Sequence, residues 1–357
     1  MKKAKARTKS KTKTRSKAKA APKAKTKTAA RTTAKIAPTR TGPLYLTEDD
    51  VRKLVTVKDA IATLENLFAT WAEPSTINLP RQRARIGHGS FNLMGAAWGP
   101  KQLFGLKAYY GGGNGTRYHV LLYSATDGKL QAMIEADNLG QMRTGAASGL
   151  ATKLLANPAA ATLGVIGGGR QAFTQVAAVC AVRPIKTVHV FTRTPENREK
   201  FAARIERELG VKARPETTGE AAVGDADVVI TITRSAEPVL RANWLKSGVH
   251  VNAAGANTPA RRELDAETVL RSTVRATDQV AQAQHEAAEY RDLVAAGRLK
   301  WDDIVEIGNL VIGQATGRRG PKDITLFKSL GIALEDIAFA DLILRRARER
   351  GVGRPMP

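Results

Sequence analysis

Apolar and polar positions alternate in blocks between residues 163 and 277, and the blocks predict a parallel sheet covered by helices. Six short runs rich in Val and Ile are separated by longer stretches, two of which have the apolar spacing of helices. Near-continuous apolar runs are typical of strands buried on both faces, and helices between them are typical of βαβ crossovers. The expected strands are 163–167, 187–192, 211–213, 227–233, 249–254 and 273–277, with helices at 171–182 and 196–209.

The first of these strands runs into a glycine-rich turn, LGVIGGGRQA, at residues 163–172. Gly167, Gly169 and Ala172 fit the G-x-G-x-x-G/A pattern, in which the first glycine makes a tight turn and the second lets backbone N–H groups approach a pyrophosphate. Gly-rich turns are common, so the motif alone is a weak signal. Together with the alternating strands, it predicts a doubly wound α/β sheet of the Rossmann type that binds a dinucleotide.

The flanking segments have a different pattern, which predicts a second, α+β domain. Thr47 resembles a helix N-cap followed by acidic residues, and a second helix is expected near residues 58–71. Shorter runs with glycine and aromatic residues read as strands, and a small-residue helix follows. The strands are expected at 81–85, 90–94, 104–108, 119–123 and 130–136, a mobile loop at 111–115, and helices at 142–155, 304–312 and 326–346. We expect the last helices to return to the first domain, which is then discontinuous in sequence.

Charge is concentrated at the N-terminus. Residues 1–43 contain 12 Lys and 4 Arg and no acidic residue, so they carry 16 of the 24 net positive charges. Their only large apolar residue is Ile36, so we expect a disordered basic tail. Such a tail could contact nucleic acid or another polyanion in a salt-dependent way, or it could be a solvated segment that aids solubility or localisation.

The remaining composition is that of an ordinary cytoplasmic globular chain. Cys180 is the only cysteine, which excludes an internal disulfide, and its apolar neighbours indicate a buried structural thiol. Five scattered histidines have no ligand-like spacing, so we expect no metal site. No apolar run has the length of a membrane span.

The end of the second parallel strand indicates which dinucleotide binds. An NAD-binding strand usually ends in an acid that accepts from the ribose 2′-OH, but this one ends in Thr192, Arg193 and Thr194. A cation with hydroxyl donors suits a 2′-phosphate, and Arg170 could reach the same end of the ligand. We therefore expect NADP(H) rather than NAD(H), unless Arg193 merely faces solvent.

Five stretches together resemble the ornithine cyclodeaminase/μ-crystallin family. They are FGLKA at 104–108, QMRTGAAS at 141–148, GVIGGGRQA at 164–172, VNAAG at 251–255 and ITLFKSLGIALED at 324–336. The resemblance spans nearly everything after residue 44. It implies a substrate and dimerisation domain (44–143 with 312–357), a Rossmann domain (144–311), a homodimer, and activity on small α-amino or α-imino acids with a nicotinamide cofactor.

The same resemblance assigns site residues. Arg81 and Lys107 match the pair that holds the substrate carboxylate, with Lys107 also a candidate catalytic residue, and Leu330 matches a substrate-side position. A guanidinium fork and a buried ammonium suit that task. The expected cofactor contacts, from the resemblance and from the motifs above, are Arg143, Thr144, Gly167, Gly169, Arg170, Gln171, Ala172, Thr192, Arg193, Thr194, Thr231, Asn252, Ala253, Ala254, Arg261 and Ser329.

Two departures from the family's cyclodeaminases bear on the reaction. Asn92 stands where they have an acid for the distal amine of ornithine, and Asn257 stands where they have a catalytic Asp. Asn can orient a nitrogen but cannot accept its proton. We therefore expect an NAD(P)H-dependent reductase of small cyclic α-imino acids, with Asn257 catalytic in orienting the substrate and Asn92 near it. His119, Tyr109 or water could donate the proton, whereas His88 reads as a turn residue. Alternatives are a cyclodeaminase or amino-acid dehydrogenase, and a non-catalytic NADPH-dependent binding protein.

Overall fold

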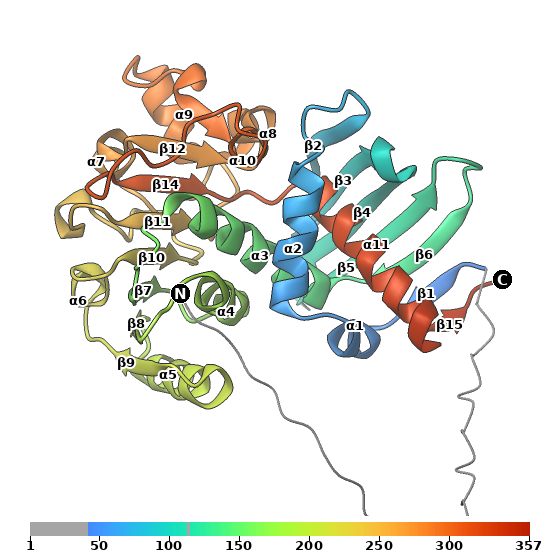
Figure 1. Ribbon diagram of the computed structural model, residues 1–357, viewed down its shortest axis with the longest axis horizontal. Helices are drawn as coiled ribbons and strands as arrows, with labels where there is room; N and C mark the ends of the chain where they lie inside the picture. Colours follow the sequence, from blue (N-terminus) through green and yellow to red (C-terminus); the bar gives the residue numbers. More distant parts are fainter. Residues whose placement is uncertain (1–41, 113–114) are drawn as a thin grey trace, which may run out of the picture. The chain divides into compact units, whose positions relative to one another are not determined.

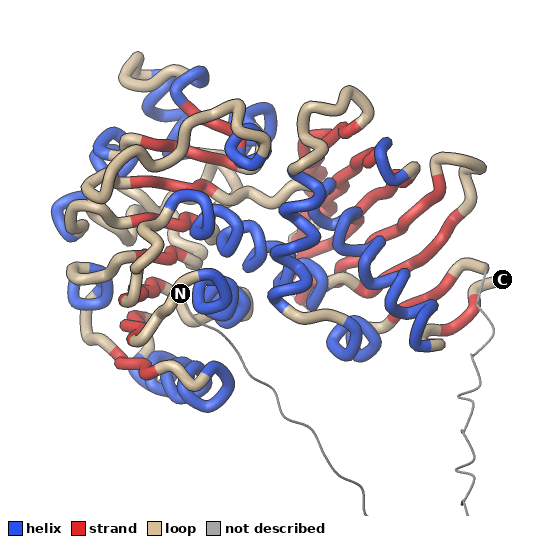
Figure 2. Tube along the Cα trace, viewed as in Figure 1, coloured by secondary structure: helices blue, strands red, loops and turns tan. Residues whose placement is uncertain are grey.

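The computed structural model describes residues 42–112 and 115–357, and these residues form two β-sheets joined by a long helix (Figure 1). Residues 1–41 of the predicted basic tail lie outside the described residues, as does the centre of the predicted glycine loop at 111–115. Figure 2 shows strands gathered in two separate groups with helices packed around them. The α/β fold with a parallel sheet is therefore confirmed.

One sheet has eight strands, all parallel, in the order β13-β12-β14-β11-β10-β7-β8-β9. Its strands are β7 (Thr162–Ile166), β8 (Thr187–Phe191), β9 (Lys212–Pro215), β10 (Val228–Thr231), β11 (His250–Ala253), β12 (Val274–Thr277), β13 (Ile304–Glu306) and β14 (Thr325–Lys328). The order in which the chain adds strands reverses between β7 and β10: β8 and β9 extend the sheet on one side of β7, and β10 begins the other side. Ligands of doubly wound sheets bind in the crevice at such a point.

Helices accompany the strands of the parallel sheet. The glycine turn leads into α4, and α5 begins with a proline at its first position, where a missing N–H costs nothing. These helices are α4 (Ala172–Val182), α5 (Pro195–Leu209), α6 (Gly219–Val223), α7 (Ala266–Arg271), α8 (Val280–Glu286), α9 (Ala288–Ala295) and α10 (Ile307–Val311), with short 3₁₀ turns η2 (Ala242–Trp244) and η3 (Trp301–Asp303).

The other sheet has seven strands in the order β15-β1-β6-β5-β4-β3-β2, and β2 to β6 form an antiparallel meander. Its strands are β1 (Leu44–Leu46), β2 (Thr76–Ile86), β3 (Gly89–Trp98), β4 (Leu103–Gly112), β5 (Gly115–Ser124), β6 (Leu130–Glu135) and β15 (Arg354–Pro355), with a 3₁₀ turn η1 (Gly99–Lys101) between β3 and β4. Alternating buried and exposed positions along β3 show that one face is packed and the other is open.

Helices α11 (Ala333–Arg350) and α1 (Glu48–Leu54) lie against the packed face of this sheet, and α2 (Val57–Phe68) packs on α11 and α3 (Asp137–Leu155) (Figure 1). The predicted N-cap is confirmed: the Thr47 hydroxyl accepts a hydrogen bond from the Asp50 backbone N–H, and the Asp50 carboxylate accepts one from the Thr47 backbone N–H. α2 and α11 share one apolar core with β3 to β6. This core holds the antiparallel sheet in place beside the parallel one.

Helix α3 runs between the sheets, and this crowded position explains why so many of its residues are small. Most of its residues are buried, and a Cβ placed on Gly145 would lie 2.5 Å from the carbonyl oxygen of Thr174 on α4. Only glycine permits that approach. The helix predicted at 142–155 is thus confirmed and starts five residues earlier.

Two predicted helices near the C-terminus were wrong in part. Residues 326–346 contain β14 and only then α11, separated by Gly331 with φ +73°. Residues 304–312 contain β13 and then the short helix α10. A short apolar run buried on both faces looks the same in a strand and in a buried helix, so periodicity could not separate them. The segment returning after residue 312 therefore gives β14 to the parallel sheet and α11 to the antiparallel one.

Candidate functional site

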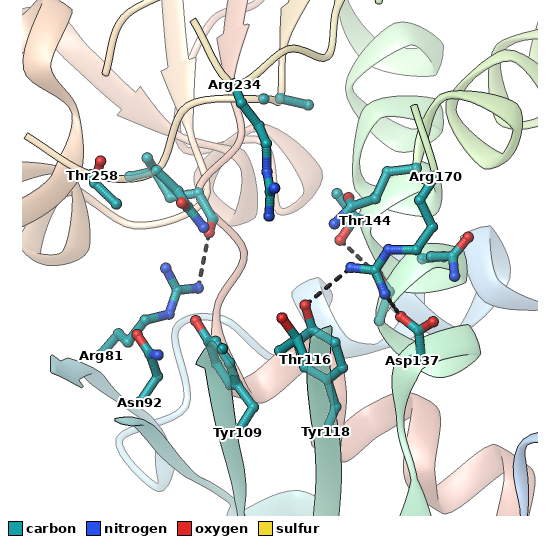
Figure 3. Close-up of a pocket in the computed structure, with 18 of the residues that line it drawn as sticks. Arg81, Asn92, Tyr109, Thr116, Tyr118, Asp137, Thr144, Arg170, Arg234 and Thr258 are labelled. Atoms are coloured by element: carbon teal, nitrogen blue, oxygen red, sulfur yellow. Dashed lines mark hydrogen bonds and ion pairs between the residues drawn. The ribbon is translucent and has the colours of Figure 1, made fainter. Parts of the chain in front are cut away.

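A cavity of about 750 Å³ lies between the carboxyl ends of the parallel strands and the strands β2 to β5 (Figure 3). Residues after β7, β10 and β11 line one side of it, and residues of β2 to β5 and the start of α3 line the other. A cavity of this volume is large enough for a small ligand with part of a dinucleotide.

The glycine turn after β7 has the geometry that a dinucleotide requires. Gly167 has φ +113°, and a Cβ there would lie 2.5 Å from the Ile232 carbonyl oxygen. Gly169 faces open space at the cavity, and α4 begins at the buried Ala172. The free backbone N–H groups at this helix N-terminus suit a diphosphate. These residues therefore fit the cofactor that the sequence predicts.

Several predicted cofactor residues also face this cavity. Gln171, Ser329 and Thr144 line it, as do Ala254 and Arg261. The side-chain oxygens of Gln171 (Oε1) and Ser329 (Oγ) are buried without a hydrogen-bond partner among the described residues, which leaves them free for a ligand. The hydroxyl of Thr144 instead donates to the Gly140 carbonyl oxygen at 2.7 Å.

Other predicted cofactor residues do not line the cavity. Thr192 follows the end of β8, where its hydroxyl donates to the Thr194 carbonyl oxygen, and Arg193 is exposed beside it. Thr231 and Ala253 are fully buried strand residues. Asn252 is corrected: its amide donates to Thr152 Oγ1 at 2.9 Å and its oxygen faces His250 Nε2, so the side chain is held inside the protein.

Arg170 lines the cavity, and its side chain pairs with residues of the opposite wall rather than with residues at the end of β8. Its guanidinium forms an ion pair with Asp137 at the start of α3 and donates to the Tyr118 hydroxyl at 3.0 Å (Figure 3). The glycine turn is therefore tied across the cavity to the opposite wall. A backbone position in a loop does not determine which way a long arginine points, and the sequence held no signal for this partner.

Lys107 on β4 is buried, and its ammonium donates to Asp336 Oδ1 at 2.8 Å. It also lies 5.4 Å from the centre of the Tyr118 ring. Burial, opposed by the Asp336 charge and assisted by Arg143, lowers the pKa of Lys107 to about 8. The amine is therefore mostly protonated at neutral pH and loses its proton in the pH range just above.

Arg81 is buried where β2 bulges, and protein acceptors already occupy its fork. Nη1 pairs with both oxygens of Glu286, at 3.1 and 2.9 Å, and Nη2 donates to the carbonyl oxygens of Leu330 and Gly331. Nε has no partner among the described residues. A bidentate grip by the fork on a substrate carboxylate, as the sequence suggested, would require these contacts to break.

Arg83, two residues along β2, is a cavity residue that sequence reasoning left without a role. It shares Glu286 with Arg81, and its Nη2 donates to the Asn257 carbonyl oxygen at 2.8 Å. Since one carboxylate faces two guanidinium groups, one positive charge is left over. Strand alternation places residues 81 and 83 on one face, but it does not show which of them pairs with an acid 200 residues away.

The two asparagines lie where the sequence placed them, in the cavity wall. Asn257 follows β11, and Asn92 on β3 donates to the Ser90 carbonyl oxygen at 3.1 Å. Arg234, also without a predicted role, extends from the loop after β10 toward the middle of the cavity (Figure 3). Among the described lining residues, Asp137 is the only acid, and it is paired with Arg170.

The candidate proton donors differ in whether they line the cavity. Tyr109 lines the cavity, and burial raises the pKa of its hydroxyl. His119 does not line it, and His88 is exposed at the turn between β2 and β3, as expected of a turn residue.

Comparison with known proteins gives the family. A sequence model of the ornithine cyclodeaminase/mu-crystallin family matches residues 42–351. The chain belongs to this family. A Δ1-pyrroline-2-carboxylate reductase of Bacillus cereus is 36% identical over 235 residues, which are 66% of this chain and 72% of that protein.

Solved structures of related proteins have the same fold. The Δ1-pyrroline-2-carboxylate reductase of Thermococcus litoralis, in complex with NADH and L-proline, is 31% identical, with a TM-score of 0.84 over 88% of this chain and all of its own. An archaeal alanine dehydrogenase dimer with bound NAD is 29% identical, with a TM-score of 0.83 over 88% of this chain and 99% of its own. No helix in the described part of this family member is long and apolar enough to cross a membrane.

Proposed function

We propose that the protein is an NAD(P)H-dependent reductase of small cyclic α-imino acids of the Δ1-pyrroline-2-carboxylate or Δ1-piperideine-2-carboxylate type. The observation that carries this proposal is the charge of the cavity wall. It presents Lys107, Arg81 and Arg83 to a carboxylate, while its only described acid, Asp137, is paired with Arg170. No unpaired lining carboxylate is left to take a proton from a substrate amine, as cyclodeamination requires.

The chain's own residues would bind and orient the imine. The ammonium of Lys107 attracts the substrate carboxylate, and the surplus charge of the Arg81–Arg83–Glu286 cluster supports it. Asn257, whose carbonyl oxygen is held by Arg83, stands beside the cavity and can orient the ring nitrogen. The bound dinucleotide supplies the hydride. Lys107, with a pKa of about 8, can hold the proton that the nitrogen needs.

NADPH is the cofactor we favour, because Arg193 replaces the expected acid after β8. The exposed guanidinium of Arg193 and the nearby Arg198 place two cations beside Thr192. The two solved relatives above carry NADH and NAD, so the preference of this chain has to be measured directly.

The test compares two reactions of the purified protein. NADPH oxidation is followed with Δ1-pyrroline-2-carboxylate and Δ1-piperideine-2-carboxylate, and ammonia release is followed with ornithine. We expect imine-dependent oxidation of NADPH and no ammonia release. Robust ammonia release without imine turnover would contradict the proposal. Tight NADPH binding with negligible turnover of any imino or amino acid would instead support a binding protein.

An amino-acid dehydrogenase is the second candidate, because the alanine dehydrogenase structure superimposes as well as the reductase does. It predicts NADH- or NADPH-dependent amination of pyruvate in the presence of ammonia. A kcat/KM for pyruvate and ammonia above that for the cyclic imines would favour it.

We also propose a homodimer. The alanine dehydrogenase relative was solved as a dimer. In this chain, large apolar side chains on β2, β3 and β4 are exposed on the face of the antiparallel sheet that no helix of the described chain covers. A second copy of this chain is the occupant we assign to that face.

A further inference from the structure

Behind the cavity wall, three buried carboxyl groups lie close to two of the buried cations of the site. Asp336 and Glu335 come from the first turn of α11, and Asp278 follows β12. Asp336 pairs with Lys107 from β4 and with Arg143 from α3, Glu335 pairs with Arg143, and the charge of Asp278 acts on Arg143. The sequence comparison assigned roles to both cations but none to these carboxyl groups.

The two neighbouring acids of α11 make different contacts. Asp336 Oδ1 accepts from Lys107 Nζ at 2.8 Å and from Arg143 Nε at 3.0 Å. Glu335 contacts Arg143 through Oε2 at 3.1 Å and lies against the Asp278 carboxyl group, and no ion pair joins it to Lys107 in the described part of the chain. One oxygen of Asp336 thus joins the substrate-side cation to the cofactor-side cation, and Glu335 does not.

The electrostatic surroundings also distinguish Asp336 from Glu335. Burial together with Asp278 raises the pKa of Glu335 well above its usual range, whereas Arg143 and Lys107 hold the pKa of Asp336 low despite its burial. Asp336 is therefore the carboxylate whose charge this cluster favours, and it is the one that bonds directly to both cations.

We propose that Asp336 is a positioning residue that keeps Lys107 charged and aimed into the cavity, and that holds Arg143 with the same oxygen. The proposal builds on the proposed function, in which Lys107 binds the imine carboxylate and holds a proton. An ammonium buried near Arg143 and Arg81 would lose its proton readily without a carboxylate in contact. The charged or titratable groups around the pair are Arg81 of β2, Tyr109 of β4, Tyr118 of β5, Arg143 of α3, Asp278 after β12 and Glu335 of α11.

The test measures the protonation of Lys107 directly. Trace acetic anhydride acetylates only the neutral amine, and mass spectrometry of the peptide that contains Lys107 gives its labelling rate against pH. Asp336→Asn should move the midpoint of that curve down by roughly 1 to 3 pH units, because the opposing charge is lost while an acceptor remains. Glu335→Gln is the matched control on the same helix turn, and its midpoint should equal that of the wild type.

Steady-state kinetics add a functional readout. In Asp336→Asn, the alkaline limb of kcat/KM for the imine should move down with the labelling midpoint, so that activity recovers at lower pH. An unchanged or raised labelling midpoint, or an equal loss of kcat/KM at every pH, would overturn the proposal. If the wild type reduces no imine, the proposed function fails, while the labelling midpoints still decide the role of Asp336.

A second variant covers the case in which Asp336→Asn does not fold, as judged by circular dichroism. Arg143→Gln removes the cation that competes for Asp336 Oδ1 and that lowers the pKa of Lys107. The labelling midpoint should then rise. A midpoint that stays at the wild-type value would overturn the proposal.

Discussion

Arg193 is the residue on which the cofactor preference depends. It is exposed after β8, where an acid would repel a 2′-phosphate. Replacing Arg193 with Ala should lower kcat/KM for NADPH about 10- to 100-fold, equivalent to roughly 1.4 to 2.7 kcal/mol, and change that for NADH little. Initial rates with each cofactor at saturating imine give the ratio. Arg207→Ala, at the far end of α5, is the control; an equal loss with both cofactors would show that Arg193 does not read the phosphate.

Arg81 and Arg83 should differ in what they support, although they share Glu286. The Glu286 side chain is almost fully buried, and Arg81 also satisfies two backbone carbonyls. Arg81→Ala should therefore lower the free energy of unfolding by about 3 to 5 kcal/mol as well as weakening imine binding. Arg83 is partly exposed, so Arg83→Ala should raise the KM for the imine with a much smaller loss of stability.

Urea unfolding and imine kinetics on both variants test this difference. Equal stability losses in the two variants would contradict the distinction, and an unchanged KM in Arg83→Ala would remove that residue from substrate binding.

For individual residues, the sequence was sufficient where the chemistry of a residue follows from a local motif. Gly167, Gly169 and Lys107 lie in short matching stretches, and each lies where its motif requires. Glu286 and Asp336 were missed as partners because their roles depend on contacts across more than 200 residues. Asp336 did fall within a stretch that resembles the family, and that was its only signal.

The loops after β10 and β11 form one wall of the cavity, and a single buried carboxylate joins them. Glu263 accepts from the Thr233 backbone at 2.6 Å, from its hydroxyl at 2.8 Å, and from the Gly255 backbone at 2.7 Å. Because Gly255 has no room for a Cβ beside Thr233, the two loops are closely packed. Glu263 therefore sets the position of the wall that carries Asn257.

Glu263→Gln should loosen this wall. The amide keeps one acceptor, but its NH₂ group would face backbone N–H donors that are then left unsatisfied, at a cost of about 1 to 3 kcal/mol. We expect a higher Kd for NADPH, measured by nucleotide fluorescence, and a lower melting temperature. Glu267→Gln, which alters only an exposed ion pair with Arg298, is the control. An unchanged Kd for NADPH would show that Glu263 supports the fold alone.

At the level of elements, strongly patterned segments were predicted and short buried ones were not. β7 to β12 and α2 to α5 lie close to their expected positions. Along each of them, the spacing of apolar residues and the turn or cap residues at the ends indicate the same element. β13 and β14 are three- and four-residue strands inside a sheet, and their strand character comes from neighbours that are distant in sequence. β14 pairs with both β11 and β12, which are distant in sequence, so the local pattern of apolar residues could not predict this pairing.

For the whole molecule, the open face of the antiparallel sheet predicts assembly. Ile77, Ala97, Phe104 and Tyr123 lie opposite one another across β2 to β5, and the rings of Phe104 and Tyr123 stack 5.1 Å apart. Leu79, on the same strand as Ile77, is 58% exposed. Exposed apolar patches of this kind are typical of protein interfaces, and a stable dimer needs roughly 1,000 Å² or more of buried surface.

We therefore expect a dimer by light scattering after size-exclusion chromatography, and we expect Leu79→Lys to shift it to a monomer. A charge buried at the interface lacks a partner, whereas in the monomer this exposed side chain would keep its lysine in water. Ala295→Lys, at an exposed position of α9 beside the parallel sheet, is the control and should remain dimeric. The melting temperature of the Leu79 variant separates loss of assembly from loss of fold. A monomeric wild type, or a variant that stays dimeric, would place the interface elsewhere.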